Sequence, residues 1–120
     1  AEAQGEDSAA LTREAVLRML QSNPALGAIY NLGGGNVGLV EALRQSGRDR
    51  DILVVGHEVN AVTTPLLLGG GLDFALSSDP KPLLDAALHC ATTESPVPER
   101  RLVDFAVYTR FNLPGFSGGA

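Results

Sequence analysis

Apolar side chains recur at spacings of three and four residues in four parts of the chain, which predicts four helices. In order along the chain, the predicted helices cover residues 8–22, 36–46, 65–68 and 80–91. Asp7 or Ser8 can cap the first helix, and Gly47 can close the second. Asp79 followed by Pro80 is typical of a helix start, so the fourth helix has a clear beginning.

Short apolar runs lie between these helices and predict four strands, in residues 27–32, 51–58, 72–78 and 101–109. The second run is apolar throughout from Ile52 to Val55, a pattern expected where helices cover both faces of a parallel sheet. In the last run Val103, Phe105 and Val107 alternate with other residues, which predicts a strand with one buried face. The regular order of helix and strand predicts an α/β fold, a three-layer αβα unit with a largely parallel sheet.

Length and composition narrow the class of protein. A chain of 120 residues with 44% hydrophobic and 19% charged residues fits one small globular domain. The net charge of −5, with no dense cluster of Lys and Arg, gives this chain no surface expected to bind nucleic acid. No apolar run approaches the ~20 residues that cross a bilayer, and no secretion leader is visible, so no membrane partner is expected. The single cysteine, Cys90, forms no internal disulfide and favours a reducing, cytoplasmic location.

Each of the first three strands ends in a polar side chain. Asn31 follows the first strand, Glu58 the second and Ser78 the third. Ligands of open α/β sheets bind outside the carboxyl ends of the strands, so these three residues are predicted to share one crevice. An amide beside a carboxylate and a hydroxyl suits an uncharged ligand with many hydroxyl groups.

The glycines after the first strand allow a second interpretation. Gly33, Gly35 and Gly38 satisfy the G-x-G-x-x-G spacing of a dinucleotide-binding turn, and Glu58 follows at the distance of a ribose-binding carboxylate. A helix precedes the first strand, however, and Asn31 puts an amide where such folds usually stay apolar. No spacing typical of a catalytic triad or a metal site is evident. We therefore expect a binding module without a cofactor rather than an enzyme.

A resemblance to a known family becomes specific over 28–80. "AIYNLGGG" before a helix that closes with "EALRQSG", then "DILVVGHE", then "LLLGGGLDFALSSDP" occur in the order seen in the C-terminal lobe of the effector-binding domain of lac-repressor-type transcription regulators. These regulators share their fold with periplasmic sugar-binding proteins. The ending "VYTRFNLP" is also similar, and the resemblance covers nearly the whole chain from the first helix onward.

This resemblance implies a role for each strand-end residue. Asn31 matches the Asn or Asp that hydrogen-bonds the sugar, Glu58 matches an acidic residue, usually Asp, that holds ligand hydroxyls, and Ser78 matches a contact position usually held by Gln or Asp. Glu in place of Asp lengthens the reach by one methylene, and Ser78 loses a two-point amide contact. The ligand expected is a small, sugar-like effector.

The resemblance also implies how the intact protein works. Residues 1–120 form part of an effector-binding domain, the effector sits between two lobes, and its binding controls DNA binding through a headpiece absent from this chain. The helix at 80–91 is expected to belong to the other lobe, and a homodimer is expected to use the leucines at 66–68. The alternative is a solute-binding component of a sugar importer with the same fold.

Overall fold

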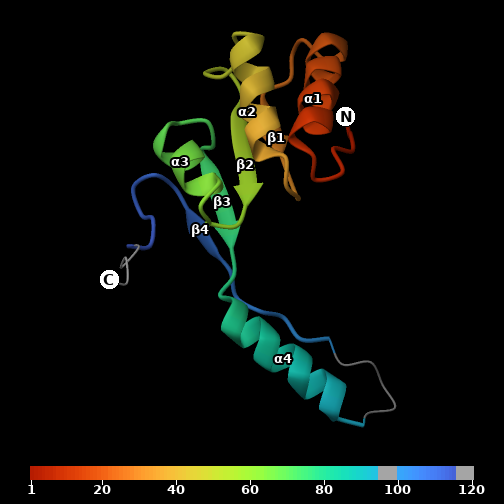
Figure 1. Cartoon of the computed structure of the whole chain (residues 1–120), viewed down its shortest axis with the longest axis vertical. Coiled ribbons are helices and arrows are strands. Elements are labelled where there is room, and N and C mark those ends of the chain that lie inside the picture. Colours follow the sequence, from red (N-terminus) through yellow and green to blue (C-terminus); the bar gives the residue numbers. More distant parts are fainter. Residues whose placement is uncertain (95–99, 116–120) are drawn as a thin grey trace.

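Four strands form one sheet in the part of the chain that the structure, a computed structural model, describes: residues 1–94 and 100–115 (Figure 1). Residues 95–99, which belong to the link before the last predicted strand, lie outside the described residues. The elements are, in chain order, α1 (Ala9–Ser22), β1 (Ala28–Tyr30), α2 (Asn36–Gln45), β2 (Leu53–His57), α3 (Thr63–Leu68), β3 (Phe74–Ser77), α4 (Pro80–Thr92) and β4 (Ala106–Tyr108).

The sheet is open and mostly parallel, which confirms the predicted fold class. Its strand order is β1-β2-β3-β4; the first two pairs are parallel and β4 runs antiparallel to β3. Tyr30 lies beside Val55, and Val55 lies beside Phe74, so the first three strands run in register across the sheet. Because they run in one direction, β1, β2 and β3 all end at the same edge.

Three predicted helix ends are confirmed by the local geometry, whereas α3 begins at Thr63, two residues before the predicted start, so that Pro65 lies within its first turn. The side chain of Ser8 accepts a hydrogen bond from the backbone N–H of Leu11 at 3.3 Å, as an N-cap does. Gly47 follows α2 with φ 68°, the left-handed conformation in which glycine has no steric penalty. Asp79 caps α4 by accepting from the N–H of Lys81 at 3.0 Å.

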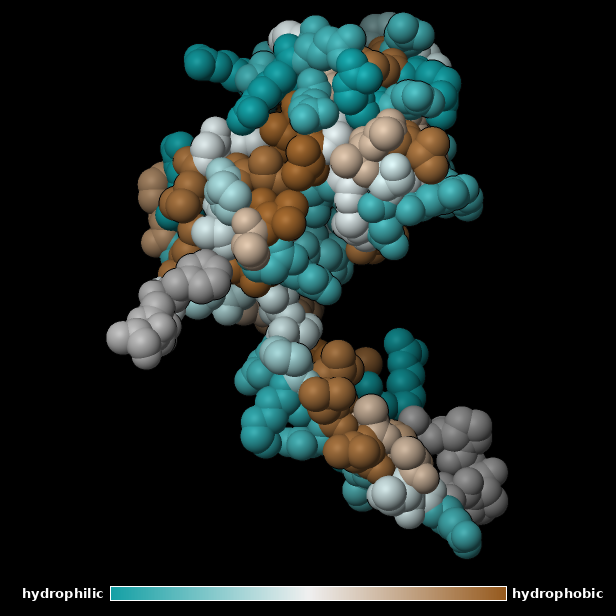
Figure 2. All heavy atoms as spheres, in the orientation of Figure 1, coloured by the Kyte–Doolittle hydropathy of each residue, from teal (hydrophilic) through white to brown (hydrophobic). Residues whose placement is uncertain are grey.

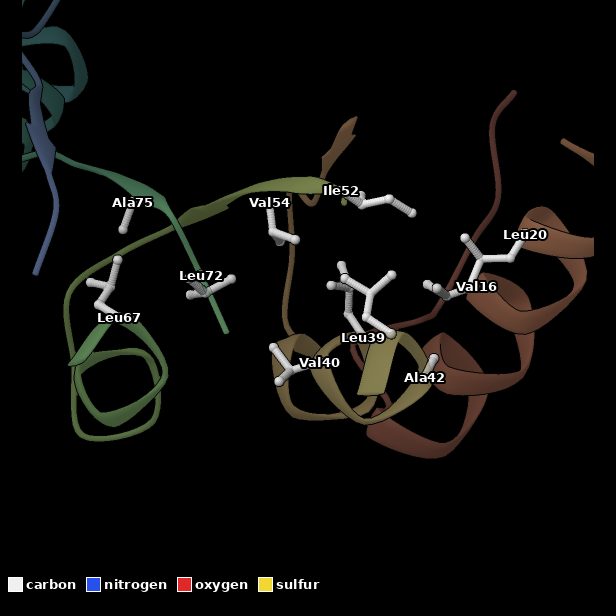
Figure 3. Packing of buried hydrophobic residues seen from close by; sticks show 11 residues of the cluster. Val16, Leu20, Leu39, Val40, Ala42, Ile52, Val54, Leu67, Leu72 and Ala75 are labelled. Carbon is white, nitrogen blue, oxygen red and sulfur yellow. The ribbon is translucent and has the colours of Figure 1, made fainter. Parts of the chain in front are cut away.

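A hydrophobic core lies between one face of the sheet and the helices α1, α2 and α3 (Figure 3). Val54 and Ala75 point from the sheet into this core, where they meet side chains of α2 and α3. The buried members of the core are Val16, Leu20, Leu39, Val40, Ala42, Leu43, Ile52, Val54, Leu67, Leu72 and Ala75. Burying each large aliphatic side chain stabilises the fold by about 1.5–3 kcal/mol, so this one layer of helices holds the unit together.

The helices α1 and α2 pack closely against each other, and Gly38 allows the approach. A Cβ atom at Gly38 would lie 2.6 Å from the carbonyl carbon and 3.0 Å from the Cα of Ala9, and closer still to the Ala9 oxygen. All three are backbone atoms of α1, which cannot turn aside as a side chain can. The contact therefore depends on the missing side chain at this position.

The opposite face of the sheet is uncovered in the described residues, which differs from the prediction of helices on both faces. Leu53 is 44% exposed and Val107 is 45% exposed, although their neighbours Val54 and Ala75 are buried. The third layer is therefore not formed by any helix that the structure describes. The predicted buried face of the last strand is also wrong, since Phe105 is 64% exposed and the strand is limited to Ala106–Tyr108.

The helix α4 stands apart from the sheet and the other helices (Figure 1). None of its residues is buried. The chain has a radius of gyration of 17.2 Å, whereas a compact domain of this length has about 13.6 Å. That α4 belongs to another lobe stays a prediction, but its place outside the core is a property of this structure.

Candidate functional site

The three polar residues singled out in the sequence follow directly on three neighbouring parallel strands. The backbone N–H of Asn31 donates to the carbonyl of Val55 at 2.8 Å, and that of Glu58 donates to the carbonyl of Leu76 at 2.7 Å. The strand pairing therefore continues up to these residues and fixes their positions at the sheet edge. Ser78 follows β3 at the same edge.

A hollow of about 440 Å³ opens at this edge beside β1 and β2. One side is formed by the glycine loop and the first turn of α2, 32–37, and the other by residues around the start of α3, including His57, Glu58, Asn60 and Thr63. Of the three predicted site residues, only Glu58 lines the hollow. The structure thus brings the strand ends together but gives the three side chains different surroundings.

The Asn31 side chain holds the glycine loop. Its Nδ2 donates to the carbonyls of Gly33 at 3.1 Å and Gly34 at 2.8 Å, and to Oδ1 of Asn36 at 2.8 Å. The side-chain amide hydrogens of Asn31 are therefore used within the protein. Its visible task is to shape one wall of the hollow, and a contact to ligand stays a prediction.

Glu58 is presented at the hollow by an unusual backbone conformation. Its φ is 65°, a left-handed value that non-glycine residues adopt only rarely. Two contacts hold this turn: Thr63 Oγ1 donates to the carbonyl of Glu58 at 2.8 Å, and Asn60 Nδ2 lies 3.4 Å from Oε2 of Glu58. Asn60 also accepts from the backbone N–H groups of Val62 and Thr63 at the start of α3. Glu58 is thus exposed, and the contacts from Asn60 and Thr63 hold the short loop that carries it.

Neighbouring residues of a strand point to opposite faces, yet His57 lines the same hollow as Glu58. Its Nε2 lies 2.6 Å from the hydroxyl of Tyr30, and the two ring centroids are 5.4 Å apart. The strand register contains the signal for this pair, because Tyr30 lies beside Val55, and Val55 and His57 share a face. An alignment of the two predicted strands would have placed both rings together.

The glycine loop already holds a carboxylate from its own chain. The backbone N–H of Gly34 donates to Oδ1 of Asp7 at 2.5 Å. Gly35 occupies the N-cap of α2 with φ 78° and no capping side chain. A pyrophosphate on this loop would have to displace Asp7, so the geometry does not favour dinucleotide binding.

Ser78 is exposed between β3 and α4 and does not line the hollow. The next residue, Asp79, directs its side chain to the N–H of Lys81 and so starts α4. The position of Ser78 is consistent with the strand-end rule, and its contact with a ligand stays a prediction.

Two other kinds of site are not found in residues 1–94 and 100–115. No group of three or more His, Cys, Asp or Glu side chains there is arranged to hold a metal ion. None of the helices in these ranges combines the length and the apolarity needed to cross a membrane.

Comparison with solved structures identifies the fold. A glucose-galactose binding protein from Geobacillus stearothermophilus superposes with a TM-score of 0.72 at 18% identity, covering 92% of this chain and 41% of that one. A solute-binding protein of an ABC transporter from Agrobacterium vitis, solved with D-fucose, gives a TM-score of 0.72 at 16% identity over 97% of this chain and 41% of that one. A third, from Actinobacillus succinogenes with bound D-allose, gives 0.70 at 18% identity, over 89% and 39%.

These similarities show the fold of this chain and how much of the longer solved structures it spans. The chain has the fold of one lobe of a type I periplasmic-binding-protein-like domain and spans about two fifths of the length of these structures. No family model matches the sequence, and no curated protein is similar to it in sequence. At 16–18% sequence identity, these comparisons show the fold of this chain but not its activity.

Proposed function

We propose that this chain is the C-terminal lobe of a two-lobed domain that binds a small, sugar-like molecule and acts as a binding module rather than an enzyme. The observation that carries the proposal is the hollow at the carboxyl ends of β1 and β2, where open α/β sheets bind their ligands. The solved structures with the same fold include proteins with D-fucose and D-allose bound.

The chemistry of the hollow suits a polyhydroxylated ligand. The Glu58 carboxylate accepts hydrogen bonds from hydroxyl groups, and the side chains of His57 and Asn60 offer further polar atoms within the same hollow. Leu32, Val37 and Val62 contribute exposed apolar surface to it. A pyranose ring offers both kinds of surface, hydroxyl groups at its rim and C–H groups on its faces.

In the intact protein, we propose, the ligand is an effector that controls DNA binding, as in the regulators that the sequence resembles. An effector held between two lobes favours one lobe arrangement, and this shifts the population of the DNA-competent dimer. The DNA contact belongs to a headpiece outside this chain, and the protein is cytoplasmic. Of the leucines proposed for a dimer contact, Leu68 is exposed at the end of α3, while Leu67 is fully buried in the core.

A solute-binding component of a sugar importer is the second candidate, and one observation favours it. Two of the structures compared above are solute-binding proteins of ABC transporters. The coding region upstream of Ala1 distinguishes the two functions: a helix-turn-helix headpiece supports the regulator, and a secretion leader supports the importer.

A binding experiment on the chain itself tests the sugar site. Uniformly labelled protein is titrated with a panel of aldoses and ketoses, and amide chemical shifts are followed by NMR. We expect saturable, weak shifts confined to residues 32–37 and 57–63, because one lobe supplies half of a site. Glu58→Gln should weaken these shifts, whereas Glu41→Gln, an exposed site on α2 outside the hollow, should not. Shifts that lie elsewhere, or that are absent with every sugar, contradict the proposal.

A further inference from the structure

The side chain of Asn36, at the start of α2, is a polar group that lies inside the fold. Polar side chains cover much of the outer surface of the molecule (Figure 2), but Asn36 is only 5% exposed. Burying an amide costs free energy unless its donors and its acceptor find partners, so a buried group without a partner calls for a physical reason.

One half of the Asn36 amide is satisfied within the protein. Its Oδ1 accepts a hydrogen bond from Nδ2 of Asn31 at 2.8 Å, and it lies 3.2 Å from the place that a Cβ atom at Gly56 of β2 would take. The other half, Nδ2 of Asn36, carries two hydrogens and donates to no group in residues 1–94 and 100–115. The bond from Asn31 fixes which way the amide points, because Oδ1 accepts it and Nδ2 does not.

The unpaired Nδ2 of Asn36 faces the hollow at the ends of β1 and β2. In the part of the chain that the structure describes, Oγ1 of Thr64 is the one side-chain polar atom that is fully enclosed and without a partner. Nδ2 of Asn36 is therefore not sealed inside the protein. Asn36 lines the hollow, and its Oδ1 is turned away toward Asn31 and Gly56, so Nδ2 is the atom that reaches a molecule held there.

Asn36 has the free donor that the sequence led us to expect at Asn31. The Nδ2 group of Asn31 is used in bonds to Gly33, Gly34 and Asn36, and Asn31 does not line the hollow. Asn36 also begins a helix of 10 residues, whose N-cap Gly35 has no capping side chain. The N–H groups at a helix start favour an oxygen acceptor, as the Asn36 amide does.

The charges around the hollow indicate that this acceptor is uncharged. Among the described residues that line the hollow, none is Lys or Arg, whereas two carry carboxylates, Asp7 and Glu58. Neither carboxylate forms an ion pair within the described residues, so a ligand carboxylate or phosphate would be repelled. A hydroxyl group suits both walls, because it accepts from an amide and donates to a carboxylate.

We propose that Asn36 is the ligand-binding amide of this lobe. Its Nδ2 donates to a hydroxyl or ring oxygen of an uncharged, sugar-like molecule, and Glu58 accepts from another hydroxyl of the same molecule. The proposal rests on the proposed function, since it assigns a further residue to the same hollow. Asn36 then contributes to specificity, because a sugar with no oxygen at that point leaves a buried donor unpaired.

Asn36→Asp tests the contact, because it removes the donor and keeps the shape of the side chain. An oxygen remains for the bond from Asn31. NMR titration with D-allose and D-fucose measures the Kd, which we expect to rise about tenfold or more in Asn36→Asp and in Asn36→Ala, which adds no charge. Gln21→Glu makes the same amide-to-acid change at an exposed site on α1 outside the hollow, and should leave the Kd unchanged.

The side-chain NH₂ signals of Asn36 in the wild-type chain give a second readout, which a purely structural role would not move. They should shift as the sugar saturates the hollow, and unshifted signals at saturation overturn the proposal even if the variants fail to fold. If Glu58→Gln weakens binding but both folded Asn36 variants keep the wild-type Kd, this inference is wrong and the proposed function stands. If no sugar gives saturable shifts with the wild type, both are wrong.

Discussion

Replacing Gly38 by alanine tests the close packing of α1 on α2. In most helices this substitution is favourable, because alanine loses less conformational entropy than glycine, a gain of about 0.5–1 kcal/mol. Here the added methyl group would meet the carbonyl carbon of Ala9 at 2.6 Å and its Cα at 3.0 Å. At this position, the helix propensity of alanine favours the substitution and the packing of α1 on α2 disfavours it. The sign of the change in the free energy of unfolding shows which effect is larger.

The magnitude follows from what must move. Overpacking a core by one methyl group costs about 1–3 kcal/mol where side chains can adjust. The obstructing atoms at Gly38 belong to the backbone of α1, so the two helices must separate, and the cost lies toward the upper end. After the propensity gain is subtracted, we expect Gly38→Ala to lower the free energy of unfolding by about 1–2 kcal/mol. In a domain of this size, that lowers the Tm by roughly 4–8 °C.

Thermal and urea denaturation, followed by circular dichroism, measure the effect. Gly27→Ala is the matched control, because a Cβ at Gly27 meets nothing within 4 Å. That control should change stability by no more than about 0.5 kcal/mol in either direction, or raise it slightly through the unfolded state. If Gly38→Ala raises the Tm as much as an ordinary glycine-to-alanine change in a helix, α1 and α2 are not packed as closely as the structure shows.

The remaining predictions concern the core, one loop and the site. Leu39→Ala, at a side chain only 1% exposed, should cost about 2–5 kcal/mol in urea unfolding; a loss below 1 kcal/mol would contradict its central place in the core. Arg48→Ala should cost about 1–3 kcal/mol, because the Arg48 guanidinium, in the loop after α2, donates to the carbonyls of Pro24 and Leu26; Arg44→Ala, an exposed cation in the last turn of α2, is the control. Glu58→Ala and Asn31→Ala should each weaken effector binding by the intact protein by about 1–3 kcal/mol in calorimetry. Asn31→Ala should also loosen the glycine loop, seen as faster amide exchange at 33–36, and unchanged binding by both variants would refute the site.

The sequence predicted those parts of the fold that depend on neighbouring residues. The caps at Ser8, Gly47 and Asp79 and the parallel order of the first three strands follow from short-range signals, and all are present. The open face of the sheet was not predicted, because a continuous apolar strand such as β2 has the same sequence whether or not a helix covers its second face. None of the residues of α4 is buried, and its amphipathic pattern indicates which side is apolar but not what that side meets.

The positions of the three candidate residues at the strand ends were predicted, but their contacts were not. The strand-end rule put Asn31, Glu58 and Ser78 at one edge, and they lie there. The rule does not say which side chains are used internally, so the bonds that engage Asn31 in the glycine loop were not foreseen. The approach of Asp7 to Gly34 joins residues far apart in the chain, and no local spacing encodes it.

The left-handed backbone at Glu58 limits which residues can replace it. Each Cβ-bearing residue in that conformation carries a penalty of roughly 1–2 kcal/mol, and the penalty is lowest for asparagine, aspartate and glycine. Valine, isoleucine and threonine are the least tolerated there. Substitution at this position therefore favours short acids, amides or glycine. If the hollow binds a ligand as proposed, a change to an apolar ligand would have to come from the other walls of the hollow.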